Sequence, residues 1–155
     1  MVDTVGIVGL GLIGGSLARR LTAYEERGVR VVAWNHRPHP YAQAEADGIF
    51  CKSTLSELMD AEPDVVVLCN PLKAMPAILA ALAPLMGDHP NTTLTDVGSV
   101  KGMVRDQVKA AGLGKCYVGA HPAGRPPTRI CTTVPYGPSP WTSPRTTAAS
   151  STSPR

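Results

Sequence analysis

Apolar and polar positions alternate in blocks along the first 123 residues of the chain. Short apolar runs at residues 4–8, 30–34, 64–69, 92–97 and 116–120 predict strands. The stretches between them, at residues 13–24, 40–48, 53–60, 71–86 and 100–112, have helical patterns. Strand and helix in this strict order predict right-handed crossovers, and therefore a doubly wound parallel α/β sheet with helices on both faces.

Turn and cap residues support several of these element boundaries. Pro40 and Gly48 are typical of the start and the end of a helix. Ser53 or Thr54 is the expected N-cap of the helix at 53–60, and Glu57 would complete a capping box. Pro76 must kink the helix at 71–86 unless it lies in the first turn.

The pattern stops near residue 123. Residues 124–155 are rich in proline, serine and threonine, and they hold four arginines and no acidic residue. Proline interrupts helices and strand ladders, and few apolar groups remain to offset the entropy of ordering. We therefore expect one domain over residues 1–123 and a disordered tail over residues 124–155.

Composition narrows the class of protein further. Hydrophobic residues make up 43% and charged residues 17%, which is enough to bury a core. The tail carries four of the positive charges, so the net charge of +3 leaves −1 for residues 1–123, with no electrostatic footprint for nucleic acid. We expect no membrane span and no secretory signal. The chain has four cysteines, Cys51, Cys69, Cys116 and Cys131, and no two of them form a C-x-x-C pair. We therefore expect reduced thiols, no metal site and a cytoplasmic location.

Gly9, Gly11 and Gly14 form the pattern G-x-G-x-x-G between the first predicted strand and the first predicted helix. In a dinucleotide site the first glycine makes the tight turn, the second admits the pyrophosphate, and the third lets the helix pack closely. The helix N-terminus offers free N–H groups to the phosphates. A glycine-rich turn without a ligand is the alternative, but the strand-to-helix context favours dinucleotide binding, with Leu12 and Ile13 in the same site.

The end of the second strand bears on the choice of cofactor. NAD sites usually place an acidic residue there, on the ribose hydroxyls, but this chain has Asn35, His36 and Arg37. An amide can still bond a hydroxyl, and Arg37 could pair with a 2′-phosphate. The sequence therefore favours NADP slightly over NAD, unless His36 and Arg37 are merely solvated loop residues.

Ligands of such sheets bind outside the carboxyl ends of the strands. Asn70 and Pro71 follow the strand at 64–69, and we expect them to line the adenosine or the nicotinamide side. Ser99 follows the strand at 92–97 and His121 follows the strand at 116–120. Both should reach the sheet edge that carries the glycine loop, where they could meet.

Four motifs in a fixed order carry a resemblance to a known family. The segments GIVGLGLIGGSLARRL, DVVVLCNPLKAM, TDVGSVKG and VGAHP resemble the prephenate dehydrogenases, which include the arogenate dehydrogenases. The resemblance covers residues 4 to about 122. Its specific part is DVGSVK followed about twenty residues later by His-Pro, since the glycine motif alone occurs in many dehydrogenases.

The resemblance implies NAD(P)-dependent oxidative decarboxylation of prephenate or arogenate, in tyrosine biosynthesis. A hydride passes from the hydroxyl-bearing ring carbon to the nicotinamide, and loss of carbon dioxide makes the ring aromatic. By motif, His121 is the hydrogen-bond partner of the substrate hydroxyl, a role that suits a pKa near neutrality. Ser99 would orient His121 or touch the nicotinamide, and Asp96 would hold the loop. A direct role for Lys101 is left open, as is a merely structural histidine at 121.

The sequence departs from the family after Pro122. The segment HPAGRPPTRI loses the family pattern, and the helical dimerisation domain, with its arginine for a substrate carboxylate, does not follow. An abrupt acid-free tail is what a frameshift produces in GC-rich coding DNA, so we hypothesise a lost reading frame; a natural flexible tail is the alternative. A homodimer is expected only of a full-length form. Two alternative functions remain. One is another Rossmann-type enzyme, such as a 3-hydroxyacid dehydrogenase or an imine reductase, and the other is a non-catalytic dinucleotide-binding fragment.

Overall fold

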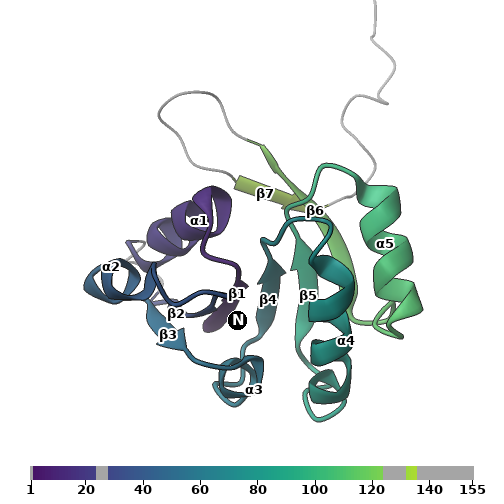
Figure 1. Ribbon diagram of the computed structural model, residues 1–155, viewed down its shortest axis with the longest axis horizontal. Coiled ribbons are helices and arrows are strands. Elements are labelled where there is room, and N and C mark those ends of the chain that lie inside the picture. The colour runs from purple at the N-terminus through teal and green to yellow at the C-terminus, as the bar shows by residue number, and fades with distance from the viewer. Residues whose placement is uncertain (1, 24–27, 124–131, 136–155) are drawn as a thin grey trace, which may run out of the picture.

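Seven strands form one sheet in the order β3-β2-β1-β4-β5-β6-β7 (Figure 1). The computed structural model describes residues 2–23, 28–123 and 132–135, with the backbone alone at 121–123 and 132–135. β1 to β6 are parallel, and β7 pairs antiparallel with β6. The strands are β1 (Thr4–Val8), β2 (Arg30–Trp34), β3 (Phe50–Lys52), β4 (Val65–Leu68), β5 (Thr93–Asp96), β6 (Tyr117–Ala123) and β7 (Thr132–Pro135).

Five helices connect the parallel strands: α1 (Leu12–Thr22), α2 (Tyr41–Ala46), α3 (Leu55–Met59), α4 (Met75–Met86) and α5 (Lys101–Ala110). The chain moves outward from β1 to β3 and then returns to β4 on the other side of β1 (Figure 1). The carboxyl ends of β1 and β4 therefore flank the point where the strand order reverses, which is the ligand crevice of such sheets. The predicted doubly wound α/β fold is confirmed.

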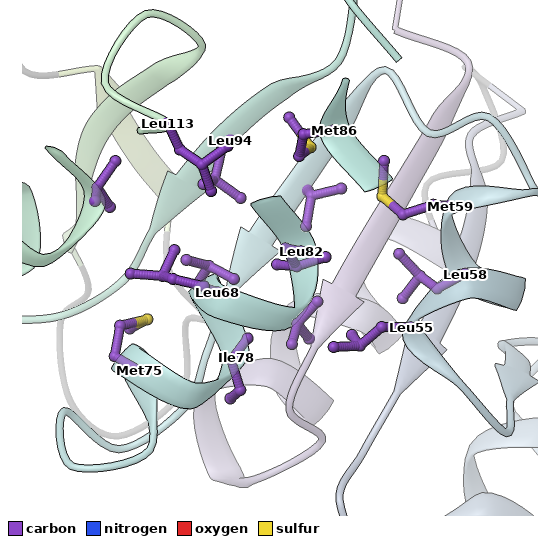
Figure 2. Packing of buried hydrophobic residues seen from close by; sticks show 14 of the residues in the cluster. Leu55, Leu58, Met59, Leu68, Met75, Ile78, Leu82, Met86, Leu94 and Leu113 are labelled. Atoms are coloured by element: carbon purple, nitrogen blue, oxygen red, sulfur yellow. The ribbon is translucent and has the colours of Figure 1, made fainter. Parts of the chain in front are cut away.

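Two apolar clusters, one on each face of the sheet, hold these layers together. In β1, Val5 and Ile7 pack with α1 and α2, whereas Val8 packs with α3, α4 and α5. This alternation gives a central strand that is buried on both faces. The larger cluster is rich in leucine and methionine (Figure 2), and its labelled members are Leu55, Leu58, Met59, Leu68, Met75, Ile78, Leu82, Met86, Leu94 and Leu113.

Local signals in the sequence account for the starts of α3 and α4. Thr54 is the N-cap of α3: its Oγ1 accepts the Glu57 N–H at 3.1 Å, and Glu57 Oε2 accepts the Ser53 N–H at 2.9 Å. Pro76 is the second residue of α4, where its missing N–H costs no helical hydrogen bond. It therefore lies in the first turn of the helix, the position in which no kink was expected. Residues 71–74 form a turn before α4 rather than its start.

The structure differs from the sequence prediction at two strands. β3 was not expected, because it has only three residues and adds to the edge of the sheet beside β2. β7 falls within the segment predicted to be disordered, yet it pairs with residues 120–123 of β6. Residues 124–131 and 136–155 lie outside the described part of the chain, so the disordered tail and the lost reading frame stay predictions. Tyr24, expected at the end of α1, and Cys131 lie outside it as well.

None of the helices in the described ranges is both long enough and apolar enough to cross a membrane.

Asp64 fastens the start of β1 beside β4. Its Oδ2 accepts the backbone N–H groups of Thr4 at 2.9 Å and Asp3 at 2.7 Å. These hydrogen bonds, the one from Thr4 first, lower the pKa of the Asp64 carboxyl, because they favour its charged form. A carboxyl whose pKa is lower in the folded state stabilises the fold above its unfolded pKa, near 3.9, and that contribution is lost as the pH falls through the folded value.

We predict that Asp64→Asn lowers the stability of the domain at about pH 7, and that the difference from wild type shrinks as the pH falls below about 4. Denaturant midpoints measured at both pH values check this. Asp88→Asn is the control, because Asp88 is exposed and makes no side-chain hydrogen bond within the described residues. An equal loss of stability at both pH values would contradict the assignment.

Candidate functional site

The glycine loop joins β1 to α1 at the point where the strand order reverses. Gly9 has φ +104°, a left-handed conformation that favours glycine, and its N–H donates to the Trp34 carbonyl at 2.7 Å. A Cβ on Gly9 would lie 2.9 Å from Asn70 Nδ2. The chain therefore turns sharply here and lies against the residues that follow β4.

Gly14 and Gly11 meet opposite surroundings. A Cβ on Gly14 would collide with the Gly9 carbonyl oxygen and approach Cys69 Cβ to 2.9 Å, so the backbone of α1 packs directly on the loop. A Cβ on Gly11 would have no described heavy atom within 4 Å. Gly9 and Gly14 are thus required by close packing within the protein, whereas Gly11 faces open space. This is the arrangement that a pyrophosphate needs.

The first turn of α1 is open as well. Gly11 is its N-cap, no side chain of the described residues caps this end, and its first turn holds no acidic residue. The N–H groups in the first turn of α1, and the positive end of the helix dipole, are therefore free to bind a phosphate. Leu12 is 93% exposed and Ile13 is 45% exposed, so both present apolar surface at the mouth of the site.

Beside this turn, a cavity of about 290 Å³ separates α1 from α2. Its lining includes Gly11, Gly15, Ser16, Arg19, Pro40 and Ala44.

Both amide atoms of the Asn35 side chain bind backbone groups of the protein. Asn35 Oδ1 accepts the Leu10 N–H at 2.9 Å, and its Nδ2 donates to the Arg37 carbonyl at 2.8 Å. Tyr41 Oη accepts the Asn35 N–H at 3.0 Å and donates to the Lys52 carbonyl at 2.8 Å. Asn35 therefore ties the glycine loop to the end of β2, and a bond from it to a ribose hydroxyl stays a prediction.

The side chains that follow Asn35 are accessible. His36 and Arg37 are both exposed, and the His36 ring lies edge-on to Trp34 with 6.5 Å between ring centroids. Residues 35–40, NHRPHP, contain no carboxylate. The end of β2 thus presents an accessible guanidinium and no acidic side chain.

Asn70 follows β4 on the other side of the glycine loop. Its Oδ1 is buried and finds no hydrogen-bond partner among the described residues, while the neighbouring Pro71 is exposed. An unsatisfied buried acceptor costs about 1–3 kcal/mol, so a ligand that donates to it recovers that free energy. The open Gly11 and this acceptor together fit a phosphate ligand that carries a hydroxyl or amide donor.

Ser99 and His121 reach the same edge of the sheet. Ser99 is exposed in the loop of residues 97–100 between β5 and α5. Asp96 is paired with Gly119 across β5 and β6, so His121 lies two residues beyond that pair. The structure describes only the backbone at His121, and a contact between the two side chains stays a prediction.

Asp96 is fully buried at the end of β5 and accepts hydrogen bonds from three sides. Its carboxylate accepts the Gly98 N–H at 2.7 Å and the Tyr117 hydroxyl at 2.5 Å, and both of its oxygens lie 2.8 Å from Lys101 Nζ. Lys101 is thus a partner of Asp96. Burial, the hydrogen bond to Asp96 and the charge of Asp96 raise the pKa of Tyr117.

Tyr117 was missed by the sequence analysis, because nothing in CYVGA signals a buried carboxylate next to it. Within the described residues, no group of His, Cys, Asp and Glu side chains could hold a metal ion. Cys51 and Cys116 carry free thiols.

Residues 17–126 match the family model of the prephenate dehydrogenase nucleotide-binding domain. The chain belongs to this family. It is 33% identical over 120 residues to a cyclohexadienyl dehydrogenase of Zymomonas mobilis. The aligned residues cover 76% of this chain and 40% of that protein. The resemblance found in the sequence is confirmed.

Solved structures agree with this assignment. A prephenate dehydrogenase of A. aeolicus, in complex with hydroxyphenyl propionate and NAD+, has a TM-score of 0.68 at 31% identity, over 79% of this chain and 42% of that one. An arogenate dehydrogenase of Synechocystis has a TM-score of 0.64 at 31% identity, over 80% and 42%. The chain spans about two fifths of the length of these relatives.

Gly14 is closely packed and Gly11 faces open space, so the two positions should respond differently to an added methyl group. We predict that Gly14→Ala destabilises the domain by at least about 2 kcal/mol, because α1 must move away from the loop. Gly11→Ala should cost at most about 1 kcal/mol, since its Cβ enters open space. Chemical denaturation of both variants measures the difference, and similar losses of stability would contradict the distinct roles of the two positions.

Proposed function

We propose that this chain supplies the nucleotide-binding wall of an NADP-preferring dehydrogenase that oxidatively decarboxylates prephenate or arogenate. The observation that carries the proposal is the opening at Gly11, beside the uncapped first turn of α1 and the unsatisfied Asn70 Oδ1. The proposed reaction is supported by the family and by the named activities of its relatives.

Each half of a dinucleotide has its place at the sheet edge in this proposal. The pyrophosphate lies over Gly11 and the N–H groups of Leu12 and Ile13, because these groups have no helical acceptor. The ribose next to adenine belongs at the end of β2, so the nicotinamide half belongs on the β4–β5 side. Asn70 and Pro71 follow β4, where Asn70 Oδ1 accepts a donor from the ligand.

The chemistry that a bound dinucleotide supplies is acceptance of a hydride from the substrate ring. In the proposed mechanism, His121 accepts the hydrogen bond, and then the proton, of the substrate hydroxyl at an imidazole nitrogen. Ser99 orients His121 or contacts the nicotinamide side. The remaining task of the protein is to hold the reacting carbon and the cofactor in line, while loss of the ring carboxylate drives the step.

The preference for NADP rests on the end of β2. A carboxylate there would bind two ribose hydroxyls and repel a 2′-phosphate, but residues 35–40 contain none. Asn35 already uses both amide atoms on backbone groups, and Arg37 is exposed beside it. A guanidinium pairs well with phosphate, so Arg37 is our candidate for the 2′-phosphate.

We also propose a cytoplasmic location for the protein.

Two other functions fit the same fold. A non-catalytic dinucleotide-binding module would keep the glycine site without turnover. Another Rossmann-type dehydrogenase would keep the cofactor and act on a different substrate.

The test has two parts, because the chain spans about two fifths of the length of its relatives. The purified chain is titrated with NADPH and with NADH, and we expect tighter binding of NADPH. Turnover is measured on a full-length form, with prephenate or arogenate and NADP+ or NAD+, by the absorbance of the reduced nicotinamide, and we expect reduction together with release of carbon dioxide. Cofactor binding without turnover in that full-length form would favour the non-catalytic module. Oxidation of a hydroxyacid, but not of prephenate or arogenate, would favour another dehydrogenase.

The variant Arg37→Gln separates the cofactor preference from cofactor binding itself. Loss of one charge-assisted contact should weaken NADPH binding about tenfold and leave NADH binding nearly unchanged. Arg20→Gln is the control, since Arg20 is an exposed arginine in the last turn of α1. Equal effects on both cofactors would argue against contact with a 2′-phosphate.

A further inference from the structure

The buried carboxylate of Asp96 joins three elements at the sheet edge that carries Ser99. Asp96 is the last residue of β5, Lys101 is the first residue of α5, and Tyr117 is the first residue of β6. All three meet at the Asp96 side chain, at distances of 2.5–2.8 Å. The fourth contact, from the Gly98 N–H, comes from the loop between β5 and α5.

The contacts compensate the cost of burying a charge. The exposed fraction of Asp96 is 0%, and an unpaired carboxylate in that position would be strongly unfavourable. The Lys101 ammonium balances its charge, while Gly98 and Tyr117 donate neutral hydrogen bonds. Removing one partner of such a buried pair therefore has a large effect on what the pair holds in place.

What the pair holds in place is the loop of residues 97–100. Ser99 and Val100 are exposed, so side-chain packing does little to fix that half of the loop. A Cβ on Gly98 would come within 3.0 Å of Asp96 Oδ2, so the loop backbone lies directly on the carboxylate. The loop starts at Asp96 and ends at Lys101, and the two side chains close it into a ring.

We propose that Asp96 is the positioning residue of the nicotinamide half of the site, where it holds Ser99 and the loop of residues 97–100 against the cofactor. The inference rests on the proposed function. Within it, the glycine loop at β1 binds the pyrophosphate independently of Asp96, because β4 separates β1 from β5 in the sheet. Loss of the carboxylate should therefore weaken contacts to the nicotinamide and spare contacts to the adenosine half.

The test compares two probes on the Asp96→Asn protein: NADPH, and adenosine 2′,5′-bisphosphate, which lacks the nicotinamide. We expect NADPH binding, followed by its fluorescence, to weaken by about tenfold. Binding of the bisphosphate, followed by calorimetry, should stay within about twofold of wild type. A role in folding alone would reduce both affinities together.

Tyr117→Phe provides a milder variant if Asp96→Asn does not fold. It removes the hydroxyl donor and keeps the Asp96–Lys101 pair, so we expect a smaller loss confined to NADPH. Asp60→Asn is the matched control, because Asp60 is exposed at the end of α3.

Equal weakening of both probes, or unchanged NADPH binding, in the folded variants would overturn the positioning role. If the wild-type protein binds neither probe, and neither NADH nor adenosine diphosphate ribose, the proposed function itself fails, and this inference fails with it.

Discussion

The direct packing of the α1 backbone on the glycine loop is the constraint on which the rest of the site depends. Gly14 lies so close to the Gly9 carbonyl that no side chain fits between them. This contact sets the direction of α1, and it aims the uncapped first turn outward from the carboxyl end of β1. The opening at Gly11 exists because the neighbouring glycines let the loop fold tightly.

Two sets of polar contacts hold the loops on either side of the glycine loop at this edge of the sheet. On the β2 side, both amide atoms of Asn35 take part: they connect the glycine loop to the residues that follow β2. On the β5 side, the buried Asp96 holds the loop that carries Ser99. A dinucleotide laid across the crevice would meet the first set with its adenosine half and the second with its nicotinamide half. The fold thus has separate polar contacts on each side of the open turn at Gly11.

The order of most elements, the tight turn at Gly9 and the close packing at Gly14 could be predicted from the sequence, because periodicity, caps and turn residues are local signals. The three-residue strand β3 could not, since it forms only by adding to β2. The resemblance did imply that Asp96 holds its own loop, but the distant partners of Asn35 and Asp96 were out of reach for a similar reason: Leu10 lies 25 residues from Asn35, and Tyr117 lies 21 from Asp96. A single sequence shows which polar residues are present, but tertiary packing decides whether they bind a ligand or brace the protein.

The most direct test of the account is a titration with NADPH followed by amide NMR of the folded protein. The account predicts that the largest shifts fall on Gly11, Leu12 and Ile13, with little change at Leu82 in the buried part of α4. Binding that leaves the three loop amides unshifted would place the cofactor elsewhere and contradict the assignment of the site.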